Sequence, residues 1–332
     1  MIISKHNLNK KVLIIAEIGN NHEGNFLLAK KMINAAAIAG ADAVKFQTFI
    51  AKNYVSEIAN PERFKMLNRF QLTIEQFKIL KLYSNQLGLI FISTPLDIDS
   101  AKNLKPLVAA YKIASGDMNF LPMIKIIAKT NKPIILSTGV SGLFDIKQTL
   151  NFIKKYRSLD KIILLHCVSS YPTLPTQANL SNINSLKKLT KIVGYSDHTI
   201  GIDASICAVT MGARVIEKHF TIDNNYSDFR DHKLSSNPID FAKLVEKIRK
   251  FEILIENKSF NSLPKKISTL IKRSIAINQN LPKGTILKKE HLTWIRPGNG
   301  LLPGVELKLI GKKLKVNLSS GTQLKMIHFL RK

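Results

Sequence analysis

The chain has 332 residues, 45% of them hydrophobic and 22% charged, which suits one large and one small globular domain, or two medium ones. No apolar run reaches the ~18 residues of a membrane span, and the first residues do not form a signal peptide. The formal net charge is +27. Because the lysines are spread along the whole chain, without a basic tail or zinc-finger spacing, we predict an attraction for an anionic substrate, and no nucleic-acid partner.

Cysteine is scarce. Cys167 and Cys207 are the two cysteines of the chain, too few for a disulfide framework. We therefore expect a cytoplasmic, reducing location.

Apolar, strand-like runs alternate with amphipathic, helix-like segments over most of the chain. The expected order is strand 12–19, helix 25–40, strand 42–49, helix 73–88, strand 89–95, a short helix from about residue 97, strand 110–116, helix 121–130, strand 133–139, helix 143–157, strand 161–167, strand 191–198, helix 202–212, strand 214–220 and helix 238–257. Thr73 and Gln76 form a capping box at the start of the second helix.

Eight buried strands, each followed by a helical or irregular crossover, predict a (β/α)8 barrel over residues 1–258. The first turn, EIGNNHEG, lacks the GxGxxG pattern of a dinucleotide site. Beyond the barrel, residues 259–274 resemble a linker. Residues 275–332 contain short alternating strands separated by Pro-Lys-Gly, Pro-Gly-Asn-Gly and Ser-Gly turns, which predict a small β-rich domain.

Polar side chains gather at the ends of the predicted strands, where barrel enzymes carry their active sites. Each residue has an ordinary explanation, such as a helix cap for Ser137 or a core position for His166. Together they are poorly explained by capping, because buried lysine and glutamate are costly without a partner or ligand. In strand order they are Glu17, Lys45, Gln47, Thr94, Lys112, Ser115, Ser137, His166, His198 and His219.

These residues divide by chemistry. Lys45, Lys112 and the two serines supply donors suited to phosphate or carboxylate, and the ASG and STG segments add backbone N–H groups. His198 and His219 end neighbouring strands and can reach one metal ion. The same pair is compatible with acid/base work, so the residues alone leave both alternatives open.

The motifs AEIGNNHEG, AVKFQTF, FISTP, YKIASGD, STG, HCVSSYPT, GYSDHT and EKHFT occur in this order. The set resembles the sialic acid synthases and their relatives that make legionaminic, pseudaminic and spore-coat nonulosonic acids. The tail, with LPKGTILKKEHLTWIRPGNGLLP, resembles the antifreeze-like (SAF) domain of that family. The resemblance covers essentially the whole chain and implies a TIM barrel followed by a β-clip SAF domain.

The resemblance also implies an activity: condensation of phosphoenolpyruvate with an open-chain N-acylated hexosamine, with a divalent metal, Mn²⁺ first and Mg²⁺ or Co²⁺ as alternatives. Glu17 would lie beside the reacting carbons, and His198 and His219 would hold the metal. Arg296 would reach from the SAF domain of one subunit into the barrel of the other, making a domain-exchanged homodimer. Phosphoenolpyruvate would be bound by Lys45, Thr94, Lys112, Ser115 and Ser137, and the sugar by Gln47, Tyr171 and Asp231.

Two positions depart from the sialic acid synthase pattern. Asp117 stands where those enzymes have Glu, and Ser169 stands where several have Asn. Both positions would contact substrate, so the departures bear on which sugar is used: N-acetylmannosamine, a 2,4-diacetamido-dideoxy sugar or a phosphorylated form. Asp117 has a structural alternative as a cap of the next helix.

Three other functions remain open. A Schiff-base aldolase would use Lys45, Lys112 or Lys218. The second is a 3-deoxy sugar-acid synthase from a different class of phosphoenolpyruvate-condensing enzymes, and the SAF-like tail argues against it. The third is a non-catalytic carbohydrate-binding or nucleic-acid-binding protein. In the loop after the last strand, His232 has no evident role and is expected to face solvent or to support the site, whereas Asp223 and Asp228 are expected to be ordinary loop residues.

Overall fold

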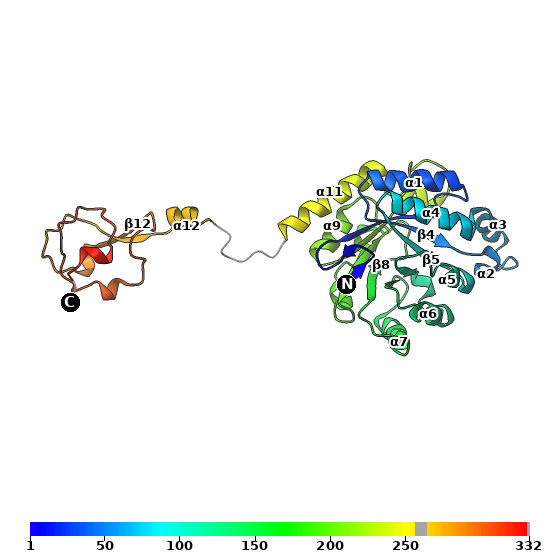
Figure 1. Cartoon of the computed structure of the whole chain (residues 1–332), viewed down its shortest axis with the longest axis horizontal. Helices are drawn as coiled ribbons and strands as arrows, with labels where there is room; N and C mark the ends of the chain where they lie inside the picture. Colours follow the sequence, from blue (N-terminus) through cyan, green and yellow to red (C-terminus); the bar gives the residue numbers. More distant parts are fainter. Residues whose placement is uncertain (256–263, 331–332) are drawn as a thin grey trace. The chain divides into compact units, whose positions relative to one another are not determined.

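The computed structural model describes residues 1–255 and 264–330 and divides the chain into two compact units, Met1–Glu256 and Asn257–Lys332 (Figure 1). In the first unit, eight parallel strands pair in chain order, and the last returns to the first to close a barrel. The predicted (β/α)8 barrel and all eight of its strands are therefore confirmed. They are β3 (Leu13–Gly19), β4 (Ala43–Thr48), β5 (Ile90–Pro95), β6 (Tyr111–Ile113), β7 (Ile134–Ser137), β8 (Ile162–Cys167), β9 (Ile192–Asp197) and β10 (Val215–His219).

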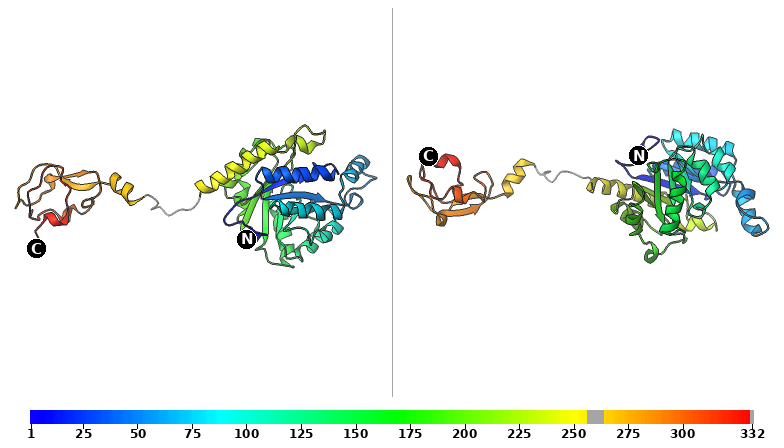
Figure 2. Two further views of the ribbon diagram at one scale, coloured as in Figure 1. Left: turned by 45° about the horizontal axis from the view of Figure 1, so that its top comes forward. Right: turned by 90° about the horizontal axis from the view of Figure 1, so that it is seen from below.

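The helices of this unit surround the barrel (Figures 1 and 2). The predicted capping box is present at the start of α4, where Thr73 Oγ1 accepts from Gln76 N at 3.2 Å and Gln76 Oε1 accepts from Thr73 N at 2.8 Å. Four short helices, α2, α3, α8 and α10, were not predicted. The full set is α1 (Phe26–Ile38), α2 (Ala51–Tyr54), α3 (Pro61–Phe70), α4 (Ile74–Gln86), α5 (Ile98–Asn103), α6 (Leu121–Ala128), α7 (Leu143–Lys154), α8 (Asn182–Leu186), α9 (Asp203–Thr210), α10 (Arg230–Leu234) and α11 (Pro238–Leu254).

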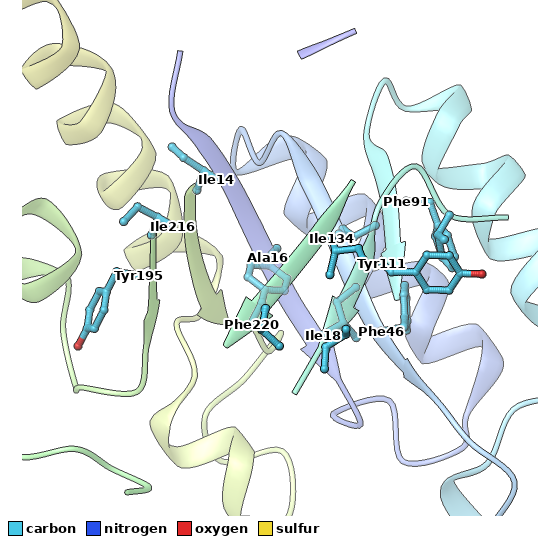
Figure 3. Close-up of a cluster of buried hydrophobic side chains, with 14 of the residues drawn as sticks. Ile14, Ala16, Ile18, Phe46, Phe91, Tyr111, Ile134, Tyr195, Ile216 and Phe220 are labelled. Carbon is cyan, nitrogen blue, oxygen red and sulfur yellow. The ribbon is translucent and has the colours of Figure 1, made fainter. Parts of the chain in front are cut away.

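Alternation along the strands creates two apolar layers. On β3, Ile14, Ala16 and Ile18 pack outward against the helices, in the cluster drawn in Figure 3. Leu13 and Ile15 belong to a separate cluster that fills the barrel interior. The next interior residue along β3 is Glu17, so the interior changes from apolar to polar toward the carboxyl ends of the strands.

A short N-terminal hairpin of β1 (Ile2–Ile3) and β2 (His6–Asn7) was not predicted. Ile3 and Leu8 are fully buried and belong to the same cluster as the interior residues at the start of the strands. The hairpin thus covers the amino ends of the strands with apolar side chains and leaves the opposite end for the polar residues.

The second unit contains α12 (Lys265–Ile271) and an antiparallel pair, β11 (Ser274–Ile277) and β12 (Leu292–Ile295). Its core is apolar and includes Ile275, Leu287, Leu314 and Phe329. Helix α12 lies in the segment expected to be a linker and is tied to this unit by a bond from Gly298 N to Thr269 O (2.7 Å). Residues 256–257 of the last predicted helix and 259–263 of the linker lie outside the described residues.

Across the described residues, no helix combines the length and apolarity needed to cross a bilayer.

Candidate active site

A cavity of about 1160 Å³ opens at the carboxyl ends of the barrel strands. It brings together residues from all eight strands and from the loops that follow them. Twelve residues singled out from the sequence line it: Glu17, Lys45, Gln47, Thr94, Lys112, Ser115, Asp117, Ser137, Tyr171, His198, His219 and Asp231. This convergence is the geometry expected of an active site in a (β/α)8 barrel.

Four buried charges form a network on the cavity floor. Lys45 Nζ lies 2.8 Å from Glu17 Oε2 and 3.6 Å from Glu217 Oε1, and Lys112 Nζ donates to Glu217 Oε1 at 3.1 Å. Each of the four residues is less than 5% exposed. Two ammonium groups and two carboxylates balance, which makes their burial tolerable in a region of low dielectric.

The network sets the protonation of its members. Burial raises the pKa of Glu17, and Lys45 only partly opposes this effect. Burial would also raise the pKa of Glu217, but Lys112 and Lys45 together lower it to about 2. Burial lowers the pKa of Lys112, whereas the pKa of Lys45 is raised because its two carboxylate neighbours outweigh its burial. Glu217 therefore stays ionised at neutral pH, whereas Glu17 holds a proton more readily than a solvent-exposed glutamate does.

Hydroxyl groups surround the two lysines. Lys45 Nζ donates to Thr94 Oγ1 at 3.2 Å. Ser115 Oγ lies 3.1 Å from Ser169 Oγ. Ser137 Oγ is buried and has no hydrogen-bond partner within the described parts of the chain. These hydroxyls and ammonium groups provide the donors that a phosphate or carboxylate group requires.

The imidazoles of His198 and His219 lie side by side, with ring centroids 5.4 Å apart. His198 Nδ1 is 2.7 Å from the carbonyl oxygen of Val168, so Nδ1 carries the proton and Nε2 presents its lone pair. Burial, followed by the neighbouring His219, lowers the pKa of His198 to about 4, and burial lowers the pKa of His219. Both rings are therefore neutral at pH 7, the state that binds a metal.

The residues present fit a metal that keeps open coordination positions. His219 Nδ1 is buried and makes no hydrogen bond to any described residue. Within residues 1–255 and 264–330, no group of three or more His, Cys, Asp or Glu side chains is spaced to hold a metal ion. Two imidazoles without further protein ligands suit a divalent cation that is completed by substrate and water, and do not suit a closed structural site.

The rim of the cavity carries the other predicted substrate contacts. The centroid of the Tyr171 ring lies 4.3 Å from that of the His198 ring. The Arg230 guanidinium lies over the Tyr171 ring, 4.8 Å from its centroid. Gln47 Nε2 donates to Glu17 Oε1 at 3.4 Å. Asp231 is 7% exposed, and Arg230 Nε donates to its Oδ1 at 3.2 Å. These groups can hydrogen-bond a polyhydroxylated ligand above the charged floor.

Two of the predicted site residues do not line this cavity. Ser169 lines a second, neighbouring cavity of about 700 Å³, although its hydroxyl contacts Ser115. Arg296 is exposed in the second unit, directly after β12. His166, counted with the strand-end residues, belongs to the outward face of β8, where it stacks on Tyr195 (5.6 Å) and bonds Ala178 O at 2.7 Å.

The loop after β10 also differs from expectation. His232 is fully buried, so of its two expected positions the solvent-facing one is wrong and the supporting one stays a prediction; the ring bonds Thr221 Oγ1 at 2.7 Å and Glu23 Oε1 at 3.2 Å. Asp228 lines the cavity, whereas Asp223 accepts from Asn225 N in a local turn, as expected of a loop residue.

Lys218 points away from the cavity. It is 1% exposed and its ammonium group is bonded on the outward side of the strand. It is therefore excluded as a Schiff-base lysine, which leaves Lys45 and Lys112 for that alternative.

Sequence reasoning missed Glu217 and Ser196, which both line the cavity and bond each other at 3.0 Å. Each precedes a candidate histidine by two residues, so the two-residue period of a strand could have placed both on the interior face. It also missed an apolar wall formed by α3 and the last loop, with Met66, Leu67 and Phe229. No signal in the polar stretch before residue 73 indicated that wall.

Known proteins match the chain along most of its length. Residues 32–259 match the NeuB family and residues 272–329 match the SAF domain. An N,N'-diacetyllegionaminic acid synthase from Campylobacter jejuni is 41% identical over 309 residues, covering 88% of this chain and 92% of the relative. Another from Legionella pneumophila is 39% identical over 336 residues, covering 95% and 94%. The crystal structure of an N-acetylneuraminic acid (sialic acid) synthetase from Leptospira borgpetersenii, in complex with citrate, is 35% identical with a TM-score of 0.73, covering 78% of this chain and 90% of that one.

Proposed function

This chain belongs to the NeuB family, and we propose that it condenses phosphoenolpyruvate with an open-chain N-acylated hexosamine, releasing phosphate and forming a nonulosonic acid. The observation that carries the proposal is the shared cavity: Lys45 and Lys112 lie in the same space as the neighbouring imidazoles of His198 and His219. An anion site directly beside a Lewis-acid site is what this condensation requires.

We infer that the sugar carries two acetamido groups, as in the 2,4-diacetamido-dideoxy sugars. Two relatives of this chain are named for N,N'-diacetyllegionaminic acid. The apolar wall of Met66, Leu67 and Phe229 supports this choice, because acyl methyl groups need apolar contacts. N-acetylmannosamine is the alternative sugar.

In the proposed complex, Lys45 and Lys112 pair with the charges of phosphoenolpyruvate, and Thr94, Ser115 and Ser137 donate to its oxygens. Both ammonium groups are already held in place by carboxylates. They therefore meet the anion without reorganising, which is how fixed charges lower a barrier.

His198 and His219 are the proposed ligands of a divalent cation, Mn²⁺ first and Mg²⁺ or Co²⁺ as alternatives. When bound, such a cation polarises a carbonyl oxygen as a Lewis acid, here that of the sugar aldehyde. Gln47, Asp117, Ser169, Tyr171 and Asp231 orient the sugar, which contributes proximity.

The bond changes follow from this arrangement. C3 of phosphoenolpyruvate forms a bond to the aldehyde carbon, whose oxygen takes a proton from Glu17 and becomes a hydroxyl. The cation-like C2 takes the oxygen of a water molecule, whose first proton returns to Glu17. As the bond from C2 to the phosphate oxygen breaks and the keto group forms, the second proton leaves with the phosphate. The burial and raised pKa of Glu17 support its part in these transfers.

We further propose a cytoplasmic homodimer built from a barrel (1–258), a linker (259–274) and a SAF domain (275–332). Arg296 of each SAF domain contacts the acylamino group of sugar in the partner's barrel. The exposed position of Arg296 and the two free thiols support these proposals. Mixing a Glu17→Gln chain with an Arg296→Ala chain should restore activity, since one barrel of the heterodimer then has both groups. No recovery after verified subunit exchange would contradict the domain exchange.

The reaction itself is tested by phosphate release from phosphoenolpyruvate, with Mn²⁺, across a panel of N-acyl hexosamines. We expect release with a 2,4-diacetamido sugar and none after chelation. Metal-loaded enzyme that uses no sugar of the panel would refute the proposal, and substrate trapped on Lys45 or Lys112 by borohydride would favour a Schiff-base aldolase.

A further inference from the structure

A buried ion pair lies behind the two candidate metal ligands, and the proposed reaction does not use it. Asp197 and Lys218 are register partners on β9 and β10, and Lys218 Nζ lies 2.9 Å from Asp197 Oδ2. Each side chain is 1% exposed. Each also directly precedes a candidate ligand, since His198 follows Asp197 and His219 follows Lys218.

The ion pair is hydrogen-bonded to the residues on both sides of His198. Lys218 Nζ donates to Thr199 O at 2.7 Å as well as to Asp197. Asp197 Oδ1 accepts from Thr199 N at 2.8 Å and from Thr199 Oγ1 at 2.7 Å. One ammonium group on β10 therefore fixes both neighbours of His198.

Successive residues of a strand point to opposite faces. Fixing Asp197 and Lys218 on the outer face of the barrel therefore sets the direction in which the His198 and His219 side chains point into the interior. Asp197 Oδ2 also accepts from Ser205 Oγ at 2.6 Å, which anchors the pair to α9. The two rings are thus held by a frame that spans two strands and one helix.

Fold stability is a weak explanation for these charges. Apolar residues of similar volume often match or exceed a buried ion pair in stability. The outward residues that continue the register from Lys218 are Ala16, Val44 and Phe91, all apolar and packed in the outer core. The Asp197–Lys218 ion pair interrupts this apolar outer layer at the two residues that directly precede the histidines.

We propose that Asp197 and Lys218 are positioning residues that set the separation of the His198 and His219 rings and thereby the affinity for the divalent cation. The inference rests on the metal site of the proposed function. Partners that orient metal-binding histidines typically contribute 10–100-fold to metal affinity.

The test is Mn²⁺ binding without substrate, measured from the electron paramagnetic resonance signal of free Mn²⁺. In the double variant Asp197→Asn/Lys218→Met, the amide oxygen can still accept from Thr199 N and no charge is left unpaired. We expect Kd for Mn²⁺ to rise at least about 10-fold, with a thermal midpoint close to that of the wild type.

The matched control removes another ion pair, Asp42–Arg249, at the amino ends of the strands. Asp42→Asn/Arg249→Met should leave the Kd for Mn²⁺ unchanged. Lys218→Arg keeps the charge but changes the shape of the group that bridges Asp197 and Thr199, so its Kd for Mn²⁺ should lie between those of the wild type and the double variant; it replaces the double variant if that chain does not fold.

The outcomes separate this inference from the proposed function. Wild-type protein that does not bind Mn²⁺ would refute the metal site itself. Wild-type binding together with an unchanged Kd in the double variant, or in Lys218→Arg where it stands in, would overturn the positioning role alone. Weakened binding that appears equally in the Asp42/Arg249 control would also overturn it, because the effect would then be one of general stability.

Discussion

Glu217 is the central counter-charge of the cavity floor, since it contacts Lys112, Lys45 and Ser196. We predict that Glu217→Gln lowers the free energy of unfolding by about 3–5 kcal/mol, because removing one partner leaves a buried charge uncompensated. Phosphoenolpyruvate would restore the missing negative charge. Its stabilising effect, measured as a rise in thermal midpoint, should therefore be larger in the variant than in the wild type.

Glu252→Gln provides the control for this prediction. Glu252 pairs with Arg249 at 3.0 Å on the outside of the barrel and does not line the cavity. This variant should lose stability without any change in the shift produced by phosphoenolpyruvate. If the ligand raises the midpoint of Glu217→Gln no more than that of the wild type, the charge-balancing role of Glu217 is wrong.

Asp117 should make stability depend on pH. Burial raises its pKa to about 6 from a usual value of 3.8, so between these values the folded state binds more protons than the unfolded state. The contribution to stability is then fully present below pH 3.8 and is lost as the pH rises through 6. The thermal midpoint of Asp117→Asn relative to wild type should rise between pH 4 and 6 and level off above. A difference that is constant with pH would contradict this assignment.

Sequence predicted the site residues that stand at strand ends, because strand ends of a barrel converge whatever the loops do. Lys45, His198 and His219 are examples. His166 occupies the core position that was its alternative, because it lies on the outward face of β8, whereas Cys167, one residue later, lines the cavity. For His232 the sequence left a solvent-facing and a supporting position open, because burial in a loop depends on contacts such as that with Glu23, far away in sequence.

At the level of elements, two loops are joined at the cavity rim. Glu23, in the loop after β3, bonds His232 Nε2 at 3.2 Å and also contacts Ser227 and Arg69. His232 is adjacent to Asp231, the proposed sugar contact. The first loop therefore supports the last one, whereas Lys45 and Lys112 belong to strands and do not need this support.

From this difference we predict that Glu23→Ala raises KM for the sugar by about 10-fold, the equivalent of roughly 1.4 kcal/mol, and leaves KM for phosphoenolpyruvate nearly unchanged. Steady-state kinetics with each substrate varied in turn measures the effect. Glu23→Gln retains an acceptor for His232 and should lie closer to wild type. Equal increases in both KM values would contradict the proposed division between loop and strand contacts.

The strands were predictable because each is a continuous apolar run bounded by turn residues. Helices α1 and α4 also carried clear starts, in Asn25 and in the capping box at Thr73. Helices α2 and α3 were missed because half of their residues are polar and exposed. Their apolar side chains, such as Leu67 and Phe70, find partners distant in sequence, among them Leu96 and Phe229.

At the scale of the whole molecule, the formal net charge of +27 is far larger than the positive charge required to bind one anionic substrate in the cavity. The two lysines of the floor are neutralised by Glu17 and Glu217, so they contribute little field at long range. Three arginines, Arg63, Arg69 and Arg230, line the cavity and are exposed. Any long-range attraction for an anion therefore comes from the rim and the lysine-rich surface.

This distribution predicts that the two substrates respond differently to salt. Raising the ionic strength from 0.01 to 1 M shortens the Debye length from about 30 Å to about 3 Å, which removes steering by distant charges. We expect kcat/KM for phosphoenolpyruvate to fall at least about 10-fold over this range, while kcat/KM for the uncharged sugar changes little. The neutral substrate controls for effects of salt on the fold. Parallel losses for both substrates, or none for either, would mean that the lysine excess is not used to capture the anion and reflects composition alone.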